Sequence, residues 1–243
     1  MKPHWAPGTN GGSGGSFSDG WKTTLGAARG PATDSVCCLI FGNIGTFPTH
    51  RTDAYKKDTM TDMLRGSNAL LFCEHNLTRL TYHTVTPRLP TTYGKPTLVV
   101  TSLPHHPTDV YAPGGSGIVL DHKLSKFIIA SGIDSRRLGR WTWFTLQGQQ
   151  NSVITIISIY KPNPGWATYD NQMYHIRRNQ INDDLPLDEP SALWMADMDS
   201  LLEQKCSIGA VIIGGDFNQN LNDHNGQIPA MMHKHNLADA FAS

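Results

Sequence analysis

Short apolar runs separated by turn residues are the main pattern of the chain from about residue 36 onward. The runs are rich in β-branched and aromatic residues and are bounded by Gly, Pro or Asn, which is typical of strands. The segments predicted as strands are 36–42, 69–75, 97–103, 116–121, 126–132, 140–147, 152–160 and 210–216. Segments 152–160 and 210–216 alternate poorly between apolar and polar positions, which predicts strands covered on both faces.

Three segments between these strands predict helices, at 54–67, 168–183 and 191–206, and a fourth helix is expected to begin near Pro229. Segments 54–67 and 191–206 carry apolar residues at helical spacing, whereas 168–183 is polar. Strands alternate with helices in some places and follow one another directly in others. This mixture predicts an α/β protein with mixed sheets and with helices packed on the outer faces.

The first 34 residues are rich in Gly, Ser and Pro and show no periodicity, so we expect residues 1–34 to be a flexible tail and 35–243 to be one domain. The tail has no apolar core of the kind found in signal peptides. No apolar run approaches the ~18 residues of a membrane span. We therefore expect an intracellular protein of the nucleus or cytoplasm, with no membrane partner.

The composition narrows the choice of partners. The chain has 243 residues, 39% of them hydrophobic, and its 20 basic and 20 acidic residues give no net charge. Such a balance does not favour broad electrostatic capture of nucleic acid, although a local basic face stays open. The four cysteines form no C-x-x-C motif, which favours buried free thiols in a reducing compartment over a zinc site or disulfides. No obligate protein partner is inferred.

Polar residues at the ends of predicted strands are the candidates for chemistry. Asp216 and Asn218 follow the run 210–215, and side chains two apart on a strand point to the same side. A carboxylate can take a proton or orient a water, and an amide can donate to an oxyanion. The alternative is a strand that ends in an Asx-type turn.

Other predicted strands end in the same way. Glu74 closes an apolar run, and an unpaired buried charge is costly, so the residue needs either a divalent cation such as Mg²⁺ or an arginine. Asn43 and Tyr160 end two further strands. A turn residue and a core tyrosine are the ordinary alternatives for these two positions.

Five segments, "FGNIG", "LLFCEHN", "GSGIVL", "SIYKPNPG" and "IIGGDFNQN", occur in an order that resembles the endonuclease/exonuclease/phosphatase superfamily. The resemblance covers residues from about 36 to 243. The superfamily includes apurinic-site endonucleases and retrotransposon endonuclease domains. It implies a four-layer α/β sandwich, in which two mixed β-sheets lie face to face with helices outside.

The resemblance also implies roles for single residues. Glu74 is similar to the Mg²⁺ ligand of the family, with Mn²⁺ as an alternative ion, and Asn43 to the asparagine near that metal. Tyr160 resembles the tyrosine that helps to hold the phosphate. Asp216 resembles the acid that orients or deprotonates the attacking water, and Asn218 resembles the amide that stabilises the pentacovalent phosphorus.

One departure from the family pattern concerns the end of the sequence. Family members carry a late Asp and then an Asp-His pair on strands beyond G-D-x-N, whereas 25 residues follow Asn218 here. Asp223 and His224 lack the preceding apolar strand and are expected to lie in a loop. We therefore expect the last strands to be missing and the isolated chain to be poorly soluble or weakly active.

The leading hypothesis is Mg²⁺-dependent phosphodiester hydrolysis, with DNA as substrate, by the endonuclease domain of a retroelement-like protein. Arg136, Arg137 and Arg140 stand beside tryptophans and could line a nucleic-acid backbone, or could form an ordinary solvated strand entry. One alternative is a catalytically incompetent fragment or remnant of the domain. Another is a phosphatase or phospholipid phosphodiesterase of the same fold. Whether the chain is an active enzyme stays open at this point.

Overall fold

The computed structural model describes eight parts of the chain, namely residues 37–45, 54–65, 67–78, 81–82, 96–102, 114–162, 190–219 and 226–240. Of strand β3, only the backbone is described. The predicted tail 1–34, the predicted helix 168–183 and the pair Asp223–His224 lie outside the described residues.

The described strands form two four-stranded mixed sheets. In the first sheet the order is β1 (Leu39–Asn43), β2 (Ala69–Cys73), β4 (Ser116–Asp121) and β3 (Pro96–Ser102). In the second sheet the order is β5 (Ile128–Ile133), β6 (Trp141–Gln147), β7 (Val153–Tyr160) and β8 (Ala210–Asp216). Each sheet contains one parallel pair, β1 with β2 and β7 with β8, while its other neighbours run antiparallel.

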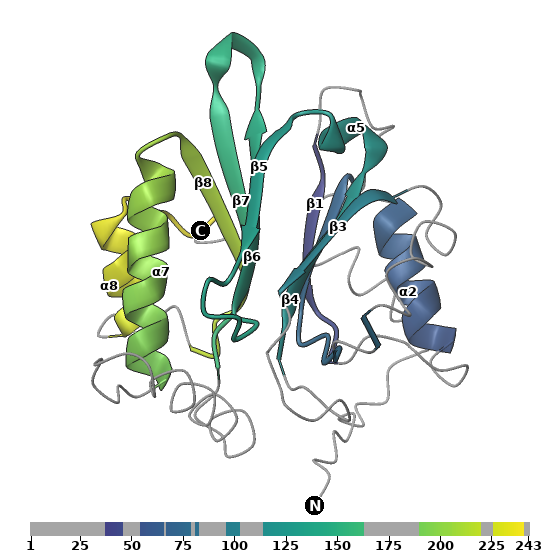
Figure 1. Ribbon diagram of the computed structural model, residues 1–243, viewed down its shortest axis with the longest axis horizontal. Helices are drawn as coiled ribbons and strands as arrows, with labels where there is room; N and C mark the ends of the chain where they lie inside the picture. Colours follow the sequence, from purple (N-terminus) through teal and green to yellow (C-terminus); the bar gives the residue numbers. More distant parts are fainter. Residues whose placement is uncertain are drawn as a thin grey trace, which may run out of the picture. The chain divides into compact units, whose positions relative to one another are not determined.

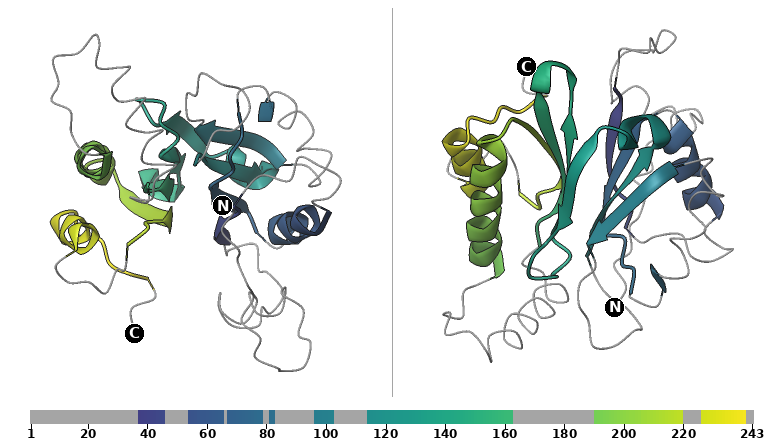
Figure 2. Two further views of the ribbon diagram at one scale, coloured as in Figure 1. Left: turned by 90° about the horizontal axis from the view of Figure 1, so that it is seen from below. Right: turned by 45° about the horizontal axis from the view of Figure 1, so that its top comes forward.

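Helices cover the outer faces of both sheets, as Figures 1 and 2 show. Helix α2 (Ala54–Arg65) packs on the first sheet through Met60, which lies among Leu70, Phe72 and Val119. Helices α7 (Pro190–Cys206) and α8 (Gln227–Lys234) pack on the second sheet through a cluster that includes Trp194. The short helix α5 (His122–Ser125) and the 3₁₀ turn η3 (Gln149–Asn151) lie in connections.

The inner faces of the sheets form a shared apolar core. Leu71 and Ile118 of the first sheet pack in one buried cluster with Phe144 and Ile156 of the second. Because side chains alternate along a strand, Trp141 of β6 belongs instead to the cluster under α7. The described layers are therefore helix, sheet, sheet and helix, and the predicted four-layer α/β sandwich is confirmed.

All eight predicted strands are confirmed, with ends that shift by a few residues, and so are the helices at 54–67, at 191–206 and near Pro229. The expectation that strand 210–216 is covered on both faces was wrong. Among the described strands β8 lies at the edge of its sheet, and the Ile212 side chain is 40% exposed. The run of β-branched residues in 210–216 suggested a central strand. Its place at the edge of the described sheet follows from the order of the strands, which the sequence pattern does not give.

Two further expectations can be compared with the described residues. None of the four cysteines, all of which are described, forms a disulfide; Cys73 is buried, whereas Cys37 is exposed. None of the described helices combines the length and the apolarity needed to cross a bilayer.

Candidate functional site

The carboxyl ends of both parallel strand pairs meet at one end of the sandwich. Asn43 is in register with Cys73 at the end of the β1–β2 pair, and Tyr160 is in register with Asp216 at the end of the β7–β8 pair. In Figure 1 this is the lower end of β7 and β8. Ligands of α/β proteins bind outside the carboxyl ends of strands, so this end is the natural place for a site.

The Asp216 carboxylate is held by two donors, one on strand β1 and one in the turn after β8. The Asn43 side-chain amide donates to Asp216 Oδ2 at 2.9 Å, which joins the first sheet to the second. The backbone N–H of Asn218 donates to Asp216 Oδ1 at 2.9 Å. A carboxylate offers about four lone-pair sites, so two bonds leave it able to accept from a water as well.

Asn218 is fixed by a tight turn at the end of β8. Its φ is 45°, in the left-handed region that Asn tolerates better than most residues. Its amide nitrogen donates to the Lys161 carbonyl at 2.6 Å, while the Lys161 N–H donates to the Asp216 carbonyl at 2.8 Å. An amide nitrogen carries two hydrogens, so this bond to Lys161 leaves a second N–H that can donate.

Glu74 lies directly beyond β2, beside these groups. Its backbone N–H donates to the Gly115 carbonyl at 2.9 Å, and its φ is 54°. The charges at this end affect the pKa of the neighbouring Cys73 thiol. The pKa of Cys73 is raised to about 12, mainly by burial and further by the charges of Asp216 and Glu74. Two carboxylates from different sheets therefore lie close enough to act on one thiol.

Tyr160 is almost fully buried at the same end. Its backbone N–H donates to the Arg140 carbonyl at 2.7 Å. Its ring packs on Gly114, where an added Cβ would lie 3.1 Å from Tyr160 Cε1. The structure thus brings Asn43, Glu74, Tyr160, Asp216 and Asn218 to one end of the sandwich, while their chemical roles stay predictions.

The chemistry of these side chains fits a hard divalent cation. Mg²⁺ is commonly held by one or two carboxylates together with waters and substrate phosphates, rather than by a complete protein cage. The carboxylates of Glu74 and Asp216 and the amide oxygen of Asn43, all at this end of the sandwich, are oxygen donors of the kind that such an ion takes. Within the described residues, no three His, Cys, Asp or Glu side chains form a metal-binding group, so a closed structural metal site is absent from this part of the chain.

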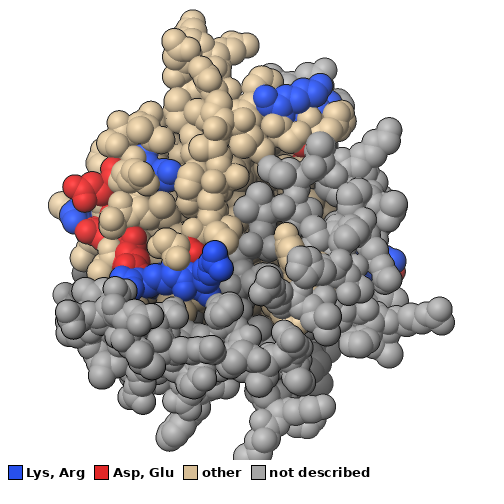
Figure 3. Space-filling model, viewed as in Figure 1, with Lys and Arg blue, Asp and Glu red and all other residues tan. Residues whose placement is uncertain are grey.

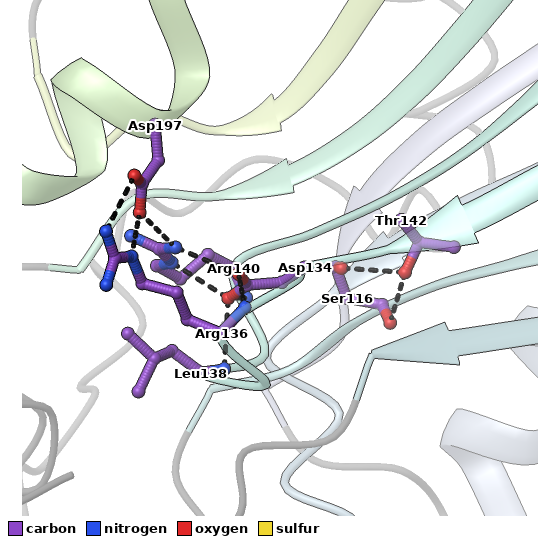
Figure 4. A network of polar contacts seen from close by, with 7 residues as sticks. All are labelled: Ser116, Asp134, Arg136, Leu138, Arg140, Thr142 and Asp197. Atoms are coloured by element: carbon purple, nitrogen blue, oxygen red, sulfur yellow. Dashed lines mark hydrogen bonds and ion pairs between the residues drawn. The ribbon is translucent and has the colours of Figure 1, made fainter. Parts of the chain in front are cut away.

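The three arginines of the predicted nucleic-acid face lie in different environments, and Figure 4 shows two of them. Arg140 is fully buried, and its guanidinium pairs with Asp134 at 2.8 Å and with Asp197 at 2.8 Å. Burial alone would lower the pKa of Arg140, but hydrogen bonds and charges from Asp134 and Asp197 raise it instead. Arg136 also pairs with Asp197, at 2.7 Å, whereas Arg137 is exposed.

Arg140 therefore ties the start of β6 to helix α7 and stacks 4.2 Å over the Trp141 ring. Contact with nucleic acid remains a prediction for the more accessible Arg136 and Arg137. On the face seen in Figure 3, the described Lys and Arg atoms form one short band that borders acidic atoms, together with separate patches. The band does not extend across the described part of this face.

Several residues at the site were not selected from the sequence. Asn76 donates to the Gly45 carbonyl at 3.4 Å and accepts from the Gly114 N–H at 2.9 Å. His75 is fully buried against Gly115. The available signal was the pair of glycines at 114–115 ahead of a strand, together with a polar run directly after Glu74.

Comparisons with known proteins give structural matches only. No family model and no curated protein matches the sequence. The AP endonuclease LMAP from Leishmania major matches with a TM-score of 0.56 at 12% identity, over 82% of this chain and 67% of that chain. The APE2 catalytic domain from Xenopus laevis matches with a TM-score of 0.52 at 12% identity, over 81% of this chain and 66% of that chain.

A third match is an endonuclease/exonuclease/phosphatase protein from Bacteroides vulgatus, with a TM-score of 0.44 at 10% identity over 82% of this chain and 70% of that chain. This chain spans about two thirds of the length of the first two structures. At such low identity the likeness shows a shared fold.

Proposed function

We propose, from the premise that this chain has the fold of the endonuclease/exonuclease/phosphatase superfamily, that it hydrolyses phosphodiesters with the help of a divalent cation. The observation that carries the proposal is the hydrogen bond from Asn43 to Asp216 across the two sheets, at the end of the sandwich where Glu74 follows β2. A carboxylate held by an amide, next to a second carboxylate, suits both cation binding and activation of a water.

Glu74 would hold the cation, with Asn43 close to it, and Mg²⁺ is the expected ion with Mn²⁺ as the alternative. When bound, such a cation neutralises charge that develops on a phosphoryl group. The chain supplies the rest of the chemistry. Asp216 would accept a proton from the attacking water while the water oxygen forms its bond to phosphorus, and Asn43 would keep the carboxylate oriented for that transfer. The ester bond between phosphorus and the leaving oxygen breaks in the same displacement, and the leaving oxygen takes its proton from solvent.

Asn218 and Tyr160 would act on the phosphate. The second N–H of the Asn218 amide can donate to a phosphoryl oxygen, since the first is held by Lys161. Tyr160 lies at the end of the neighbouring strand, in register with Asp216, and would hold the phosphate through its hydroxyl. Both groups are neutral, so they stabilise negative charge without a change in protonation near pH 7.

The substrate class follows from fold likeness and from sequence resemblance. The two best-scoring structures described above are AP endonucleases, and the ordered motifs resemble retrotransposon endonuclease domains. We therefore propose a DNA endonuclease domain of a retroelement-like protein.

The test is a metal titration that is read both as binding and as cleavage of plasmid DNA. Wild type, Glu74→Gln and Asp216→Asn are compared in Mg²⁺ and in Mn²⁺. Glu74→Gln should weaken cation binding, because a neutral amide replaces the anionic ligand. Asp216→Asn should lower the cleavage rate at saturating metal by about 10²-fold or more, because a positioned base is lost.

Glu203→Gln is the matched control, since Glu203 is an exposed glutamate on α7. It should bind metal and cleave like wild type. Equal cation affinity in wild type and Glu74→Gln would remove Glu74 from the metal site. Absence of nicking by wild type at every metal concentration would contradict the proposed activity of this chain.

A further inference from the structure

Asn76 lies where three loops of the candidate site come together, namely the loops after β1 and β2 and the loop before β4. We propose that Asn76 is a positioning residue, which holds Glu74 and the Asn43–Asp216 pair in the geometry that cation binding requires. This inference rests on the proposed function.

A continuous path of amide hydrogen bonds passes through Asn76. Asn43 donates to Asp216 at 2.9 Å, and the Asn43 side-chain oxygen accepts from the Gly45 N–H at 2.9 Å. The Gly45 carbonyl accepts from Asn76 Nδ2 at the longer distance of 3.4 Å. Asn76 Oδ1 accepts from the Gly114 N–H at 2.9 Å. One asparagine thereby links the Asp216 carboxylate to the backbone on which the Glu74 turn rests.

The Glu74 turn needs such support because its backbone is strained. Glu74 and Asn76 have φ values of 54° and 51°, in the left-handed region, which is unfavourable for Glu and better tolerated by Asn. Backbone hydrogen bonds on both sides of His75 pair this turn with Gly114 and Gly115, called the diglycine below. The Glu74 backbone N–H donates to the Gly115 carbonyl at 2.9 Å, and the Asn76 backbone N–H donates to the Gly114 carbonyl at 3.0 Å.

The diglycine is itself enclosed between two rings. A Cβ added at Gly115 would lie 2.2 Å from the His75 ring, and one added at Gly114 would lie 3.1 Å from the Tyr160 ring. His75 Nδ1 accepts from the Leu77 N–H at 3.0 Å, which fixes the ring orientation. The turn that carries Glu74 is therefore packed against the residue proposed to hold the phosphate.

This arrangement places Asn76 behind the proposed ligands rather than on the cation. Groups that orient metal ligands through hydrogen bonds commonly change metal affinity or activity by about 10–100-fold when they are replaced. Loss of the Asn76 side chain removes its bonds to Gly45 and Gly114, so Glu74 and Asp216 keep their carboxylates but lose this support. Weaker cation binding is then the expected consequence.

The experiment compares Mn²⁺ binding by wild type and Asn76→Gly, followed by electron paramagnetic resonance of free Mn²⁺. Glycine tolerates the left-handed backbone, so this change removes the side chain without adding strain. We expect a Kd that is about 10–100-fold weaker. Asn236→Gly is the matched control, because Asn236 has a φ of 55° beyond α8, and it should bind like wild type.

Equal Mn²⁺ affinity in Asn76→Gly and wild type, with weaker binding in Glu74→Gln, would overturn this inference and leave the proposed function intact. Unweakened binding in Glu74→Gln as well would overturn both. The urea midpoints of Asn76→Gly and Asn236→Gly show whether the two variants are equally folded.

Asn76→Asp gives a second test that does not depend on Asn76→Gly being folded. Aspartate keeps the acceptor for the Gly114 N–H but loses the donor to the Gly45 carbonyl, and it adds a negative charge. Charge alone would strengthen Mn²⁺ binding, whereas loss of positioning weakens it. A Kd weaker than that of wild type supports the inference, and a tighter one overturns it.

Discussion

Cys73 is a residue whose protonation is strongly affected by its surroundings. Its thiol lies buried at the end of β2, directly before Glu74 and in register with Asn43 of β1. Burial and the charges of Asp216 and Glu74 all disfavour a thiolate there. The side chain therefore acts as a small neutral group beside the proposed cation site, and not as a nucleophile.

This environment predicts a loss of stability at alkaline pH. Because the folded pKa is raised from 9.0 to about 12, the folded state keeps its proton while the unfolded state releases it. The contribution is fully present below pH ~9 and falls between pH ~9 and ~12, by at most about 1.4 kcal/mol per pH unit. Urea unfolding of wild type and Cys73→Ala at a series of alkaline pH values measures it.

Cys73→Ala is needed as the reference because Tyr and Lys residues titrate in the same range in both proteins. The free energy of unfolding of wild type should fall more steeply with pH than that of Cys73→Ala. Parallel curves would show that Cys73 does not keep its proton in the folded protein.

Strands β1 and β8 determine whether the two halves of the site meet. Each belongs to a different sheet, and they oppose one another where Gly214 faces the Phe41 ring. A Cβ at Gly214 would lie 2.4 Å from Phe41 Cδ1. The close approach allows Asn43, two residues beyond Phe41, to reach Asp216, two residues beyond Gly214.

Gly214→Ala should therefore separate the two strands. Overpacking of this kind typically costs about 1–3 kcal/mol of folding free energy. The Asn43–Asp216 bond should weaken with it, so we expect both a lower urea midpoint and a lower cation affinity. Urea unfolding and Mn²⁺ titration of the same variant measure the two effects.

Gly42→Ala is the control for this change. Gly42 lies in β1 beside Phe41. Apart from its chain neighbours, no heavy atom of the described residues would lie within 4 Å of a Cβ added there. Its stability should equal or slightly exceed that of wild type, because alanine lowers the entropy of the unfolded chain. A similar loss in both variants would mean that the β1–β8 approach is not tight.

At the scale of the whole chain, charge balance limits how DNA can be bound. Basic and acidic residues are equal in number, and the buried Arg140 is already paired with two carboxylates. Arg140 is therefore not available to contact phosphates. Binding should depend on shape and on the site more than on long-range attraction, so its dependence on salt should be shallow.

Arg137 gives a direct measure of this dependence. If its exposed guanidinium contacts a phosphate, Arg137→Ala should reduce the slope of log K against log salt by about 1. Fluorescence anisotropy of a labelled duplex, in metal-free buffer to prevent cleavage, provides the affinities. The control is Lys126→Ala, because Lys126 follows β4 at the end away from Glu74. Unchanged slopes in both variants would exclude Arg137 from the interface.

Local pattern was sufficient to determine the elements and their class. Strand 116–121 was predicted with its observed bounds, and the helix at 191–206 differs from α7 by one residue. Both follow from apolar spacing and turn residues, which act over a few neighbouring positions. The same kind of signal placed Asp216 at the end of its strand and Glu74 directly after one. Alternation did not extend to Asn218, which lies beyond β8 with a φ of 45° and donates its N–H to the Asp216 carboxylate, as in the Asx-type turn given as the alternative.

Tertiary structure alone decided which of these ends meet and which charges are already paired. Nothing near Asn43 or Asp216 in the sequence indicates that they share a hydrogen bond, because strand order brings together residues 173 positions apart. Nothing in the sequence was a reason to treat Arg140 differently from Arg136 and Arg137. In the structure Arg140 is paired with Asp134 and Asp197. The contacts of Asn76 with Gly45 and Gly114 were likewise not predictable. Such long-range contacts depend on how the sheets stack rather than on the sequence around each residue.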